Sequence, residues 1–103
     1  MAEPVILEDD DLPDDVKVLR RLPKSSNEEW IVGINEFRGN NYVQVRVYYR
    51  DEKDDDKLKP GRQGMNVHEE LLPEILGGLQ DATDLLISMP RGRQSRAKNG
   101  NNS

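Results

Sequence analysis

The sequence lacks cysteine, has few aromatic residues and contains no long apolar run. Its 103 residues include one tryptophan, one phenylalanine, three tyrosines and no cysteine. Without cysteine the chain has neither a disulfide framework nor a thiolate metal site, which fits a reducing compartment. No run of about 18 apolar residues is present, so we expect no transmembrane helix and no membrane partner. The first residues are acidic, so we expect no secretory signal.

Apolar residues make up only 34% of the chain, and the shortfall lies mostly at its two ends. This length and composition allow one domain with a modest core. We expect a folded domain over residues 16–87, between a disordered acidic tail (1–15) and a disordered basic tail (88–103). A core of this size gains from oligomerisation, because a dimer interface buries apolar surface that one subunit cannot.

The net charge of -5 argues at first against a nucleic-acid partner. However, the acidic tail holds seven acidic residues and no basic one, whereas residues 16–50 hold seven basic and three acidic residues, a net of +4. The negative total therefore describes the tail more than the expected domain.

Two interpretations of the acidic tail are open. It is a solubilising segment, which we favour, or it mimics nucleic acid and competes for the protein's own basic surface. The basic tail is either a solvated segment or a source of non-specific phosphate contacts. It also permits a weak interpretation as a nuclear address.

The clearest pattern lies in residues 42–50, where valines alternate with polar, basic and aromatic residues. Period-two alternation with β-branched and aromatic residues predicts a half-buried antiparallel strand. One face of this strand combines cationic and aromatic groups, which suits phosphates and bases of single-stranded nucleic acid. The alternating positions are Val43, Val45 and Val47 on one face and Gln44, Arg46 and Tyr48 on the other.

Three further strands are expected around this one. Residues 29–37 form its hairpin partner, and Arg38 to Asn41 form the turn, because Gly and Asn tolerate positive φ. Residues 16–22 form a first strand that Pro23 ends. Residues 58–67 form a fourth strand, in which Lys-Pro-Gly-Arg-Gln-Gly predicts a bulged or edge segment that a phosphate or base can approach closely.

A helix is expected over residues 68–87, where leucine and isoleucine recur at helical spacing. Asn66 or His68 is the candidate cap, and Pro73 is tolerated only in the first turn. Leu71, Leu85 and Ile87 widen the apolar surface beyond the main stripe, which suits a dimer.

Taken together, these segments resemble the positive cofactor four family of transcriptional coactivators. The resemblance is carried by E-F-R-G-N-N-Y-V-Q-V-R-V-Y-Y-R-D (36–51), by K-P-G-R-Q-G-M-N-V (59–67) and by the leucine-rich helix. It covers about residues 29–87, and G-M-N-V-H-E-E-L-L-P-E-I-L looks more like the compact bacterial members than the eukaryotic ones. The resemblance implies an α+β fold, a curved four-stranded antiparallel sheet followed by one C-terminal helix, assembled as a homodimer.

The resemblance also implies binding of single-stranded or unwound DNA with little sequence preference, possible contact with the transcription machinery, and no cofactor. Asn40 and Gln63 stand where eukaryotic members tend to have lysine, so we expect weaker binding with a shallower salt dependence. Tyr49 stands where they have tryptophan. The positions carried over are Phe37 and Tyr49 as stacking rings, Arg38, Arg46, Lys59 and Arg62 as backbone contacts, and Pro60 as a residue that shapes the groove.

The alternation and the resemblance disagree about which tyrosine faces DNA. Simple alternation places Tyr48 on the face of Arg46 and Tyr49 with the valines, whereas the family position favours Tyr49. A bulge or a strong twist near the end of the strand would reconcile the two. Both tyrosines are therefore candidates.

Enzymatic activity is not expected. His68 is the only histidine, and no nucleophile–base pair or phosphate-binding Gly-rich loop is visible. The acidic loop of residues 51–57 lacks the spacing of a calcium site, so no metal is expected, although a metal nuclease built on Asp51, Asp54 and Asp56 is conceivable. Two alternatives to a DNA-binding protein stay open: a protein-interaction module of the same fold, and an RNA-binding protein. The expected location is the bacterial cytoplasm with its nucleoid, or the nucleus of a eukaryote.

Overall fold

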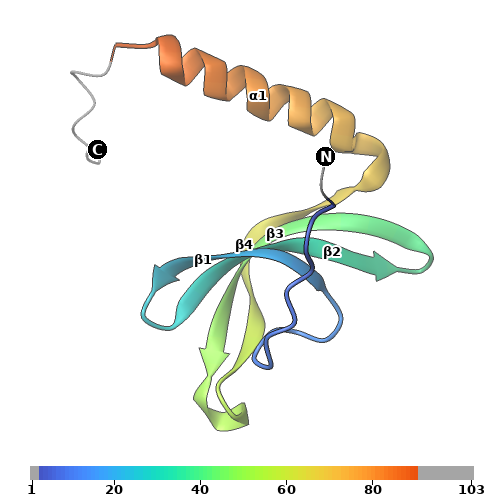
Figure 1. Ribbon diagram of the computed structural model, residues 1–103, viewed down its shortest axis with the longest axis vertical. Coiled ribbons are helices and arrows are strands. Elements are labelled where there is room, and N and C mark those ends of the chain that lie inside the picture. Colours follow the sequence, from blue (N-terminus) through green and yellow to red (C-terminus); the bar gives the residue numbers. More distant parts are fainter. Residues whose placement is uncertain (1–2, 91–103) are drawn as a thin grey trace. The chain divides into compact units, whose positions relative to one another are not determined.

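The computed structural model describes residues 3–90 and contains one antiparallel sheet, followed by one α-helix. The four strands lie side by side in sequence order, so every connection within the sheet joins neighbouring strands (Figure 1). This arrangement confirms the predicted α+β fold. The elements are β1 (Lys17–Ser25), β2 (Glu28–Phe37), β3 (Asn40–Asp51), a 3-10 turn (Glu52–Asp54), β4 (Lys57–His68), a second 3-10 turn (Glu69–Leu71) and α1 (Leu72–Ser88).

The hairpin between β2 and β3 forms where the sequence predicts it, but its turn is shorter than the predicted Arg38 to Asn41. Phe37 lies opposite Asn40, so Arg38 and Gly39 alone make the turn. Both have positive φ, 53° and 82°, as the two central residues of a type I′ turn require. The pairing is unbroken from this turn to the far end of β2, and it places each residue of β3 on a defined face of the sheet.

Two element boundaries differ from the sequence prediction by three residues or more. β1 does not end at Pro23, because this proline pairs with Glu29 and the strand continues to Ser25. β1 is an edge strand, where a missing N–H need not remove a ladder hydrogen bond. α1 begins at Leu72 rather than His68, since Pro73 has no N–H with which to continue an α-helix back toward residue 69. His68 instead caps the 3-10 turn Glu69–Leu71, which lies between β4 and α1.

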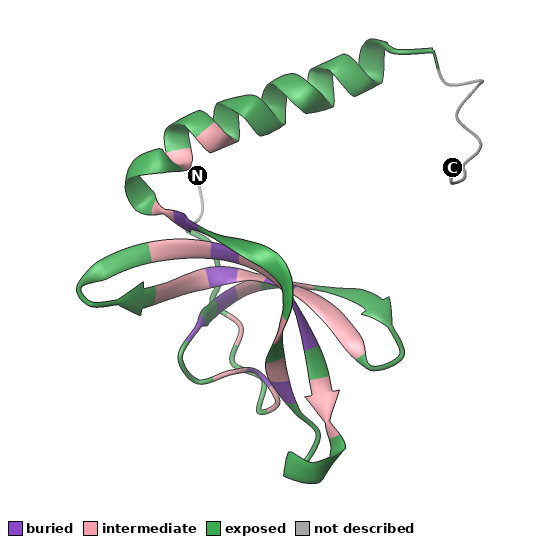
Figure 2. Ribbon diagram, turned by 180° about the vertical axis from the view of Figure 1, so that it is seen from behind, coloured by how far each residue is buried: buried purple, intermediate pink, exposed green. Residues whose placement is uncertain are grey.

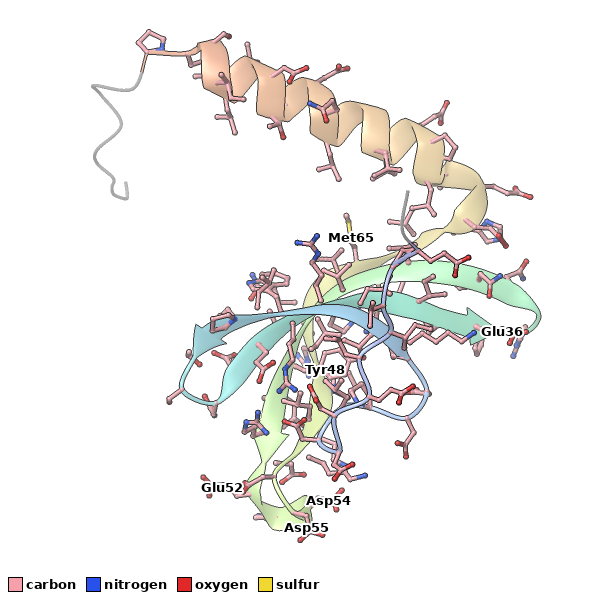
Figure 3. All side chains as sticks on the ribbon, in the orientation of Figure 1. Glu36, Tyr48, Glu52, Asp54, Asp55 and Met65 are labelled. Atoms are coloured by element: carbon pink, nitrogen blue, oxygen red, sulfur yellow. The ribbon has the colours of Figure 1, made fainter. Side chains whose placement is uncertain are left out.

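The largest buried cluster lies on the face of the sheet that carries Arg46 and Tyr48, here called the polar face. The opposite face, with Val43, Val45 and Tyr49, is the valine face, on which Val47 and Val67 are also buried. Residues directly opposite each other in paired strands share a face, and Ile31, fully buried, lies opposite Arg46. Figure 3 shows Tyr48 and Met65 on opposite sides of the sheet. The buried cluster consists of Leu12, Val16, Val18, Ile31, Tyr48 and Leu58.

Residues 7–16, here called the strap, cover this part of the polar face (Figure 1, dark blue). Leu12 is 5% exposed and belongs to the core. The Leu7 N–H donates to the Val18 carbonyl at 2.8 Å, and the Leu58 N–H donates to the Asp11 carbonyl at 3.3 Å. The expectation of a disordered tail over residues 1–15 is therefore wrong for the strap, because Leu12 supplies the apolar cover that the sheet needs.

An ion-pair network, here called the strap cluster (Asp9, Asp11, Arg21, Glu29 and Arg50), joins the strap to the sheet. Arg21 makes two hydrogen bonds to Glu29, at 2.7 and 2.8 Å, and two to Asp11, at 3.1 and 2.9 Å. Arg50 pairs with Asp11 at 2.9 Å and with Glu29 at 3.0 Å. Hydrogen bonding from Arg21 is the main cause that lowers the pKa of Asp11 to about 2. Separate hydrogen bonds from Arg21 lower the pKa of Glu29.

The chain divides into two compact units at Leu72, and α1 belongs to the second one. No residue of α1 is buried (Figure 2). Within residues 3–90, no helix combines the length and the apolarity that a membrane crossing needs.

Replacing Leu12 tests whether the strap is part of the folded core. We expect Leu12→Ala to lower the free energy of unfolding by about 2–5 kcal/mol, because it removes buried methyl groups and leaves a cavity. Chemical denaturation followed by circular dichroism measures this change. Val5→Ala is the control, since Val5 is 74% exposed. Equal stabilities of the two variants would contradict a packed strap.

Acid should weaken the strap cluster. In the folded protein the pKa of Asp11 lies at about 2, below its ordinary value of 3.8, so the folded state binds this proton more weakly than the unfolded state. The stabilisation of the folded state by ionised Asp11 is therefore complete above about pH 4 and is lost as the pH falls toward 2. Urea unfolding of wild type and Asp11→Asn at steps between about pH 5 and pH 2 checks this. The difference in unfolding free energy between the two proteins should shrink with falling pH; a constant difference would contradict the prediction.

Candidate nucleic-acid interface

The exposed end of the β2–β3 hairpin holds an aromatic ring beside a cation. Phe37 is 57% exposed, although it is the only phenylalanine in the chain. The guanidinium carbon of Arg38 lies 5.1 Å from the centre of the Phe37 ring, within cation–π range. Asn40, opposite Phe37, contacts the ring nitrogen Nε2 of His68 through its Oδ1 at 3.2 Å. This hairpin end therefore presents a π-surface, a positive charge and an amide together.

Arg46 lies on the same face, and β4 fixes its guanidinium. Its Nη1 donates to the carbonyls of Gly61 and Arg62, at 3.2 and 3.3 Å, and its Nη2 donates to Asn66 Oδ1 at 3.3 Å. These are neutral acceptors, so they hold the guanidinium in place without cancelling its charge.

Gly64 allows β4 to lie close to Arg46. Its φ is +147°, and a Cβ at this position would lie 2.5 Å from the Arg46 Cα. The register shifts between Arg46 and Tyr48, whose partners are Gly64 and Pro60. The extra residues therefore belong to β4, and the bulged edge strand predicted from Lys-Pro-Gly-Arg-Gln-Gly is confirmed. Arg62 and Gln63 are among these extra residues, and both are exposed.

The structure separates the two candidate tyrosines. Tyr48 is 3% exposed, and its hydroxyl accepts a hydrogen bond from Gln44 Nε2 at 2.6 Å. Burial raises the pKa of Tyr48. Tyr49 is 42% exposed and lies on the valine face. Because the bulge is in β4, it leaves the alternation of β3 unchanged, and the ring available to a ligand in this structure is that of Tyr49.

The β4 candidates lie near Tyr49 rather than near Phe37. Lys59 is directly opposite Tyr49 and forms an ion pair with Asp54, which raises the pKa of Lys59. Pro60 lies opposite Tyr48 and is exposed. The sheet therefore divides the candidates: Phe37, Asn40 and Arg46 share the polar face, whereas Tyr49 and Lys59 share the valine face.

Two residues on the polar face were not predicted as part of the site. The rings of Tyr42 and His68 meet edge to face, with centres 5.3 Å apart. His68 also accepts a hydrogen bond from the Glu70 N–H through its Nδ1, at 3.1 Å, as the predicted capping role requires. The signal for Tyr42 was present in the alternation, since Tyr42 and Arg46 are separated by four residues of one strand and therefore share a face.

Within residues 3–90, no three histidine, aspartate or glutamate side chains are grouped so that they could hold a metal ion. The residues gathered here are suited to stacking and to anion binding.

Comparison with known proteins agrees with this architecture. Residues 24–77 match the family described as Transcriptional Coactivator p15 (PC4). Two crystal forms, orthorhombic and tetragonal, of a PC4 homolog from Burkholderia pseudomallei K96243 are similar, each with 31% sequence identity and a TM-score of 0.56. The similarity covers 69% of this chain and 93% of the relative in the first form, and 66% and 97% in the second. No curated protein sequence matches. Because the family match spans just over half of the chain and the relatives share its sheet and helix, this chain belongs to the PC4 family of transcriptional coactivators.

Proposed function

We propose that this protein binds single-stranded or unwound DNA without sequence preference, as a homodimer that acts in transcription. Membership of the PC4 family supports the general class. The observation that carries the proposal is the exposed Phe37 ring, held beside the Arg38 guanidinium and on the same face as Arg46. A solvent-exposed ring costs hydration free energy, and covering it with a base recovers that cost.

The chemistry of these groups explains a preference for single strands. A base can stack on Phe37 only when it has left the double helix, and such stacking contributes about 1–3 kcal/mol per base. Every base has a π-face, so the contact is indifferent to sequence. Arg38 and Arg46 supply positive charge for the phosphates. The proposed contacts are Phe37, Arg38, Asn40, Arg46, Tyr49, Lys59, Pro60, Arg62 and Gln63, with Tyr48 assigned to the core.

A homodimer is supported by the apolar surface that one chain leaves exposed. Leu76, Leu79 and Leu86 lie on one stripe of α1, and each is 57–61% exposed. On the valine face, Met65 is 45% exposed. Soluble monomers rarely expose contiguous apolar patches larger than a few hundred Å². A second copy of the chain would remove this surface from water. Because the similar structures come from a bacterium, the proposed place of action is the bacterial cytoplasm.

Phe37→Ala tests the proposed stacking. We expect the variant to lose about 1–3 kcal/mol of binding free energy for an oligo-dT strand, because one base loses its platform. Fluorescence anisotropy of a labelled oligo-dT, titrated at several salt concentrations with duplex DNA and oligo-U as competitors, measures the loss.

Two variants serve as controls for this experiment. Leu22→Ala removes an exposed apolar side chain from the valine face and should leave binding unchanged. Tyr48→Phe keeps the buried ring and should also bind as wild type, whereas Tyr49→Ala should bind more weakly. A wild-type protein that binds no single strand at low salt would overturn the proposal. Equal competition by oligo-U would extend it to RNA.

Leu79→Glu tests the proposed homodimer. A charge placed in an apolar interface must be desolvated without a partner, so we expect the variant to be monomeric at concentrations at which wild type is dimeric. Gln80→Glu is the matched control, because it adds the same charge at the next position, off the apolar stripe. Sedimentation equilibrium distinguishes the two states. A monomeric wild type, or equal dissociation of both variants, would contradict the prediction.

A further inference from the structure

The strap cluster contains an anion position that sits between two guanidinium groups. Oδ2 of Asp11 lies 2.9 Å from a nitrogen of Arg21 and 2.9 Å from a nitrogen of Arg50. Asp9 adds a second carboxylate, 3.1 Å from Arg21. Two converging guanidinium groups are the arrangement that recognises phosphate oxygens, as well as carboxylates. The oxygen of Asp11 therefore occupies a place that a phosphate oxygen can fill.

The net charge of this cluster is negative with the strap carboxylates and positive without them. The two arginines carry +2, and Asp9, Asp11 and Glu29 carry -3, so the whole cluster has a net charge of -1. Without the two strap carboxylates, the same place on the sheet carries +1. Glu29 is the only acidic member that belongs to the sheet, and its side chain is 17% exposed.

The strap carboxylates are more exposed than the carboxylate of the sheet. The Asp9 side chain is 60% exposed and that of Asp11 is 30% exposed, compared with 17% for Glu29. Asp9 and Asp11 are therefore more accessible to an incoming anion than Glu29 is. The anchor of the strap is separate from these charges, because Leu12 holds it in the core.

The position of Arg50 links this cluster to the proposed interface. Arg46 and Arg50 lie on the same face of β3, four residues and about 13 Å apart. Tyr48 lies between them and is buried under the strap. A strand of nucleic acid that follows the polar face from Phe37 past Arg46 would therefore cross the strap at Tyr48 and then reach Arg50 and Arg21.

We propose that Arg21 and Arg50 form a further phosphate-binding site for the nucleic-acid backbone, which Asp9 and Asp11 of the strap occupy in the free protein. This site rests on the proposed function, because its ligand is the same single strand. The strap carboxylates imitate the phosphate and must leave the arginines before the strand extends across them. The strap thus limits the usable length of the polar face and weakens its attraction for nucleic acid.

The experiment compares two double variants with the same change of charge. Asp9→Asn with Asp11→Asn keeps the size of both side chains and removes the imitation of phosphate. Glu8→Gln with Asp10→Asn also removes two negative charges, from neighbours that make no ion pair among the described residues. Both proteins and wild type are titrated with labelled oligo-dT over a series of salt concentrations.

One additional phosphate contact steepens the slope of log affinity against log salt by about 0.7 for a single strand. We therefore expect a fourfold reduction in salt to tighten binding by roughly 2- to 3-fold more for the Asp9/Asp11 variant than for the Glu8/Asp10 variant. Adding Arg21→Gln to the Asp9/Asp11 variant should return the slope to that of the control.

Equal slopes for the two double variants, with wild type binding normally, would overturn the inference and leave the proposed function intact. If no protein binds at low salt, the proposed function fails and the inference falls with it. Thermal unfolding of each variant shows that it is folded at the assay temperature. Should the double variant unfold, Asp11→Asn alone replaces it, because Asp11 supplies the oxygen that lies between the two guanidinium groups; the same direction of change is expected, and its absence would overturn the inference.

Discussion

The packing of Leu12 into the buried cluster of the sheet is the interaction on which the first unit of this protein depends. A single four-stranded sheet has two faces, and apolar side chains on either face need cover from water. On the polar face an irregular segment, the strap, provides this cover. It supplies Leu12 and Val16, which cluster with Val18, Ile31 and Tyr48. The hydrophobic effect accounts for the cover, since each fully buried side chain of this size contributes about 1.5–3 kcal/mol. The ion pairs of Arg21 and Arg50 are arranged around a segment that Leu12 already holds.

This constraint determines which part of the polar face is available to a ligand. The strap covers the region of Tyr48, Arg21 and Arg50, whereas the end of the β2–β3 hairpin with Phe37 stays exposed. The two parts of one face therefore differ in charge: Arg46 is held only by neutral carbonyl and amide oxygens among the described residues, whereas Arg50 also pairs with two carboxylates. A face that alternation alone describes as cationic and aromatic along its length thus contains one open region and one neutralised region. The neutralisation is local, so it does not follow from the net charge.

The sequence predicted the features that depend on near neighbours. Alternation identified β3, Gly39 identified the hairpin turn, and the Pro-Gly pair with Gly64 identified the bulge in β4. It did not predict the features that depend on distant contacts. The strap was predicted to be disordered because it is acidic. A single leucine, Leu12, instead fixes its position through the core cluster, which includes strand residues far along the chain. Pro23 was expected to end β1, because nothing local shows that β1 lies at the edge of the sheet. The assignment of Tyr48 to the core required knowledge of what covers it.

The family match and the strap cluster draw attention to different residues of the polar face. Membership of the PC4 family directs attention to Phe37, Arg46 and the β4 bulge, which lie within the matched residues 24–77. Asp9, Asp11 and Arg21 lie outside that match, so their arrangement is a property of this chain that the family model does not describe. Arg50 belongs to both regions, since β3 carries it on the face of Arg46 and the strap pairs it with Asp11. A segment that stabilises the fold through Leu12 can therefore also regulate the surface through its carboxylates, because the two roles fall on different side chains.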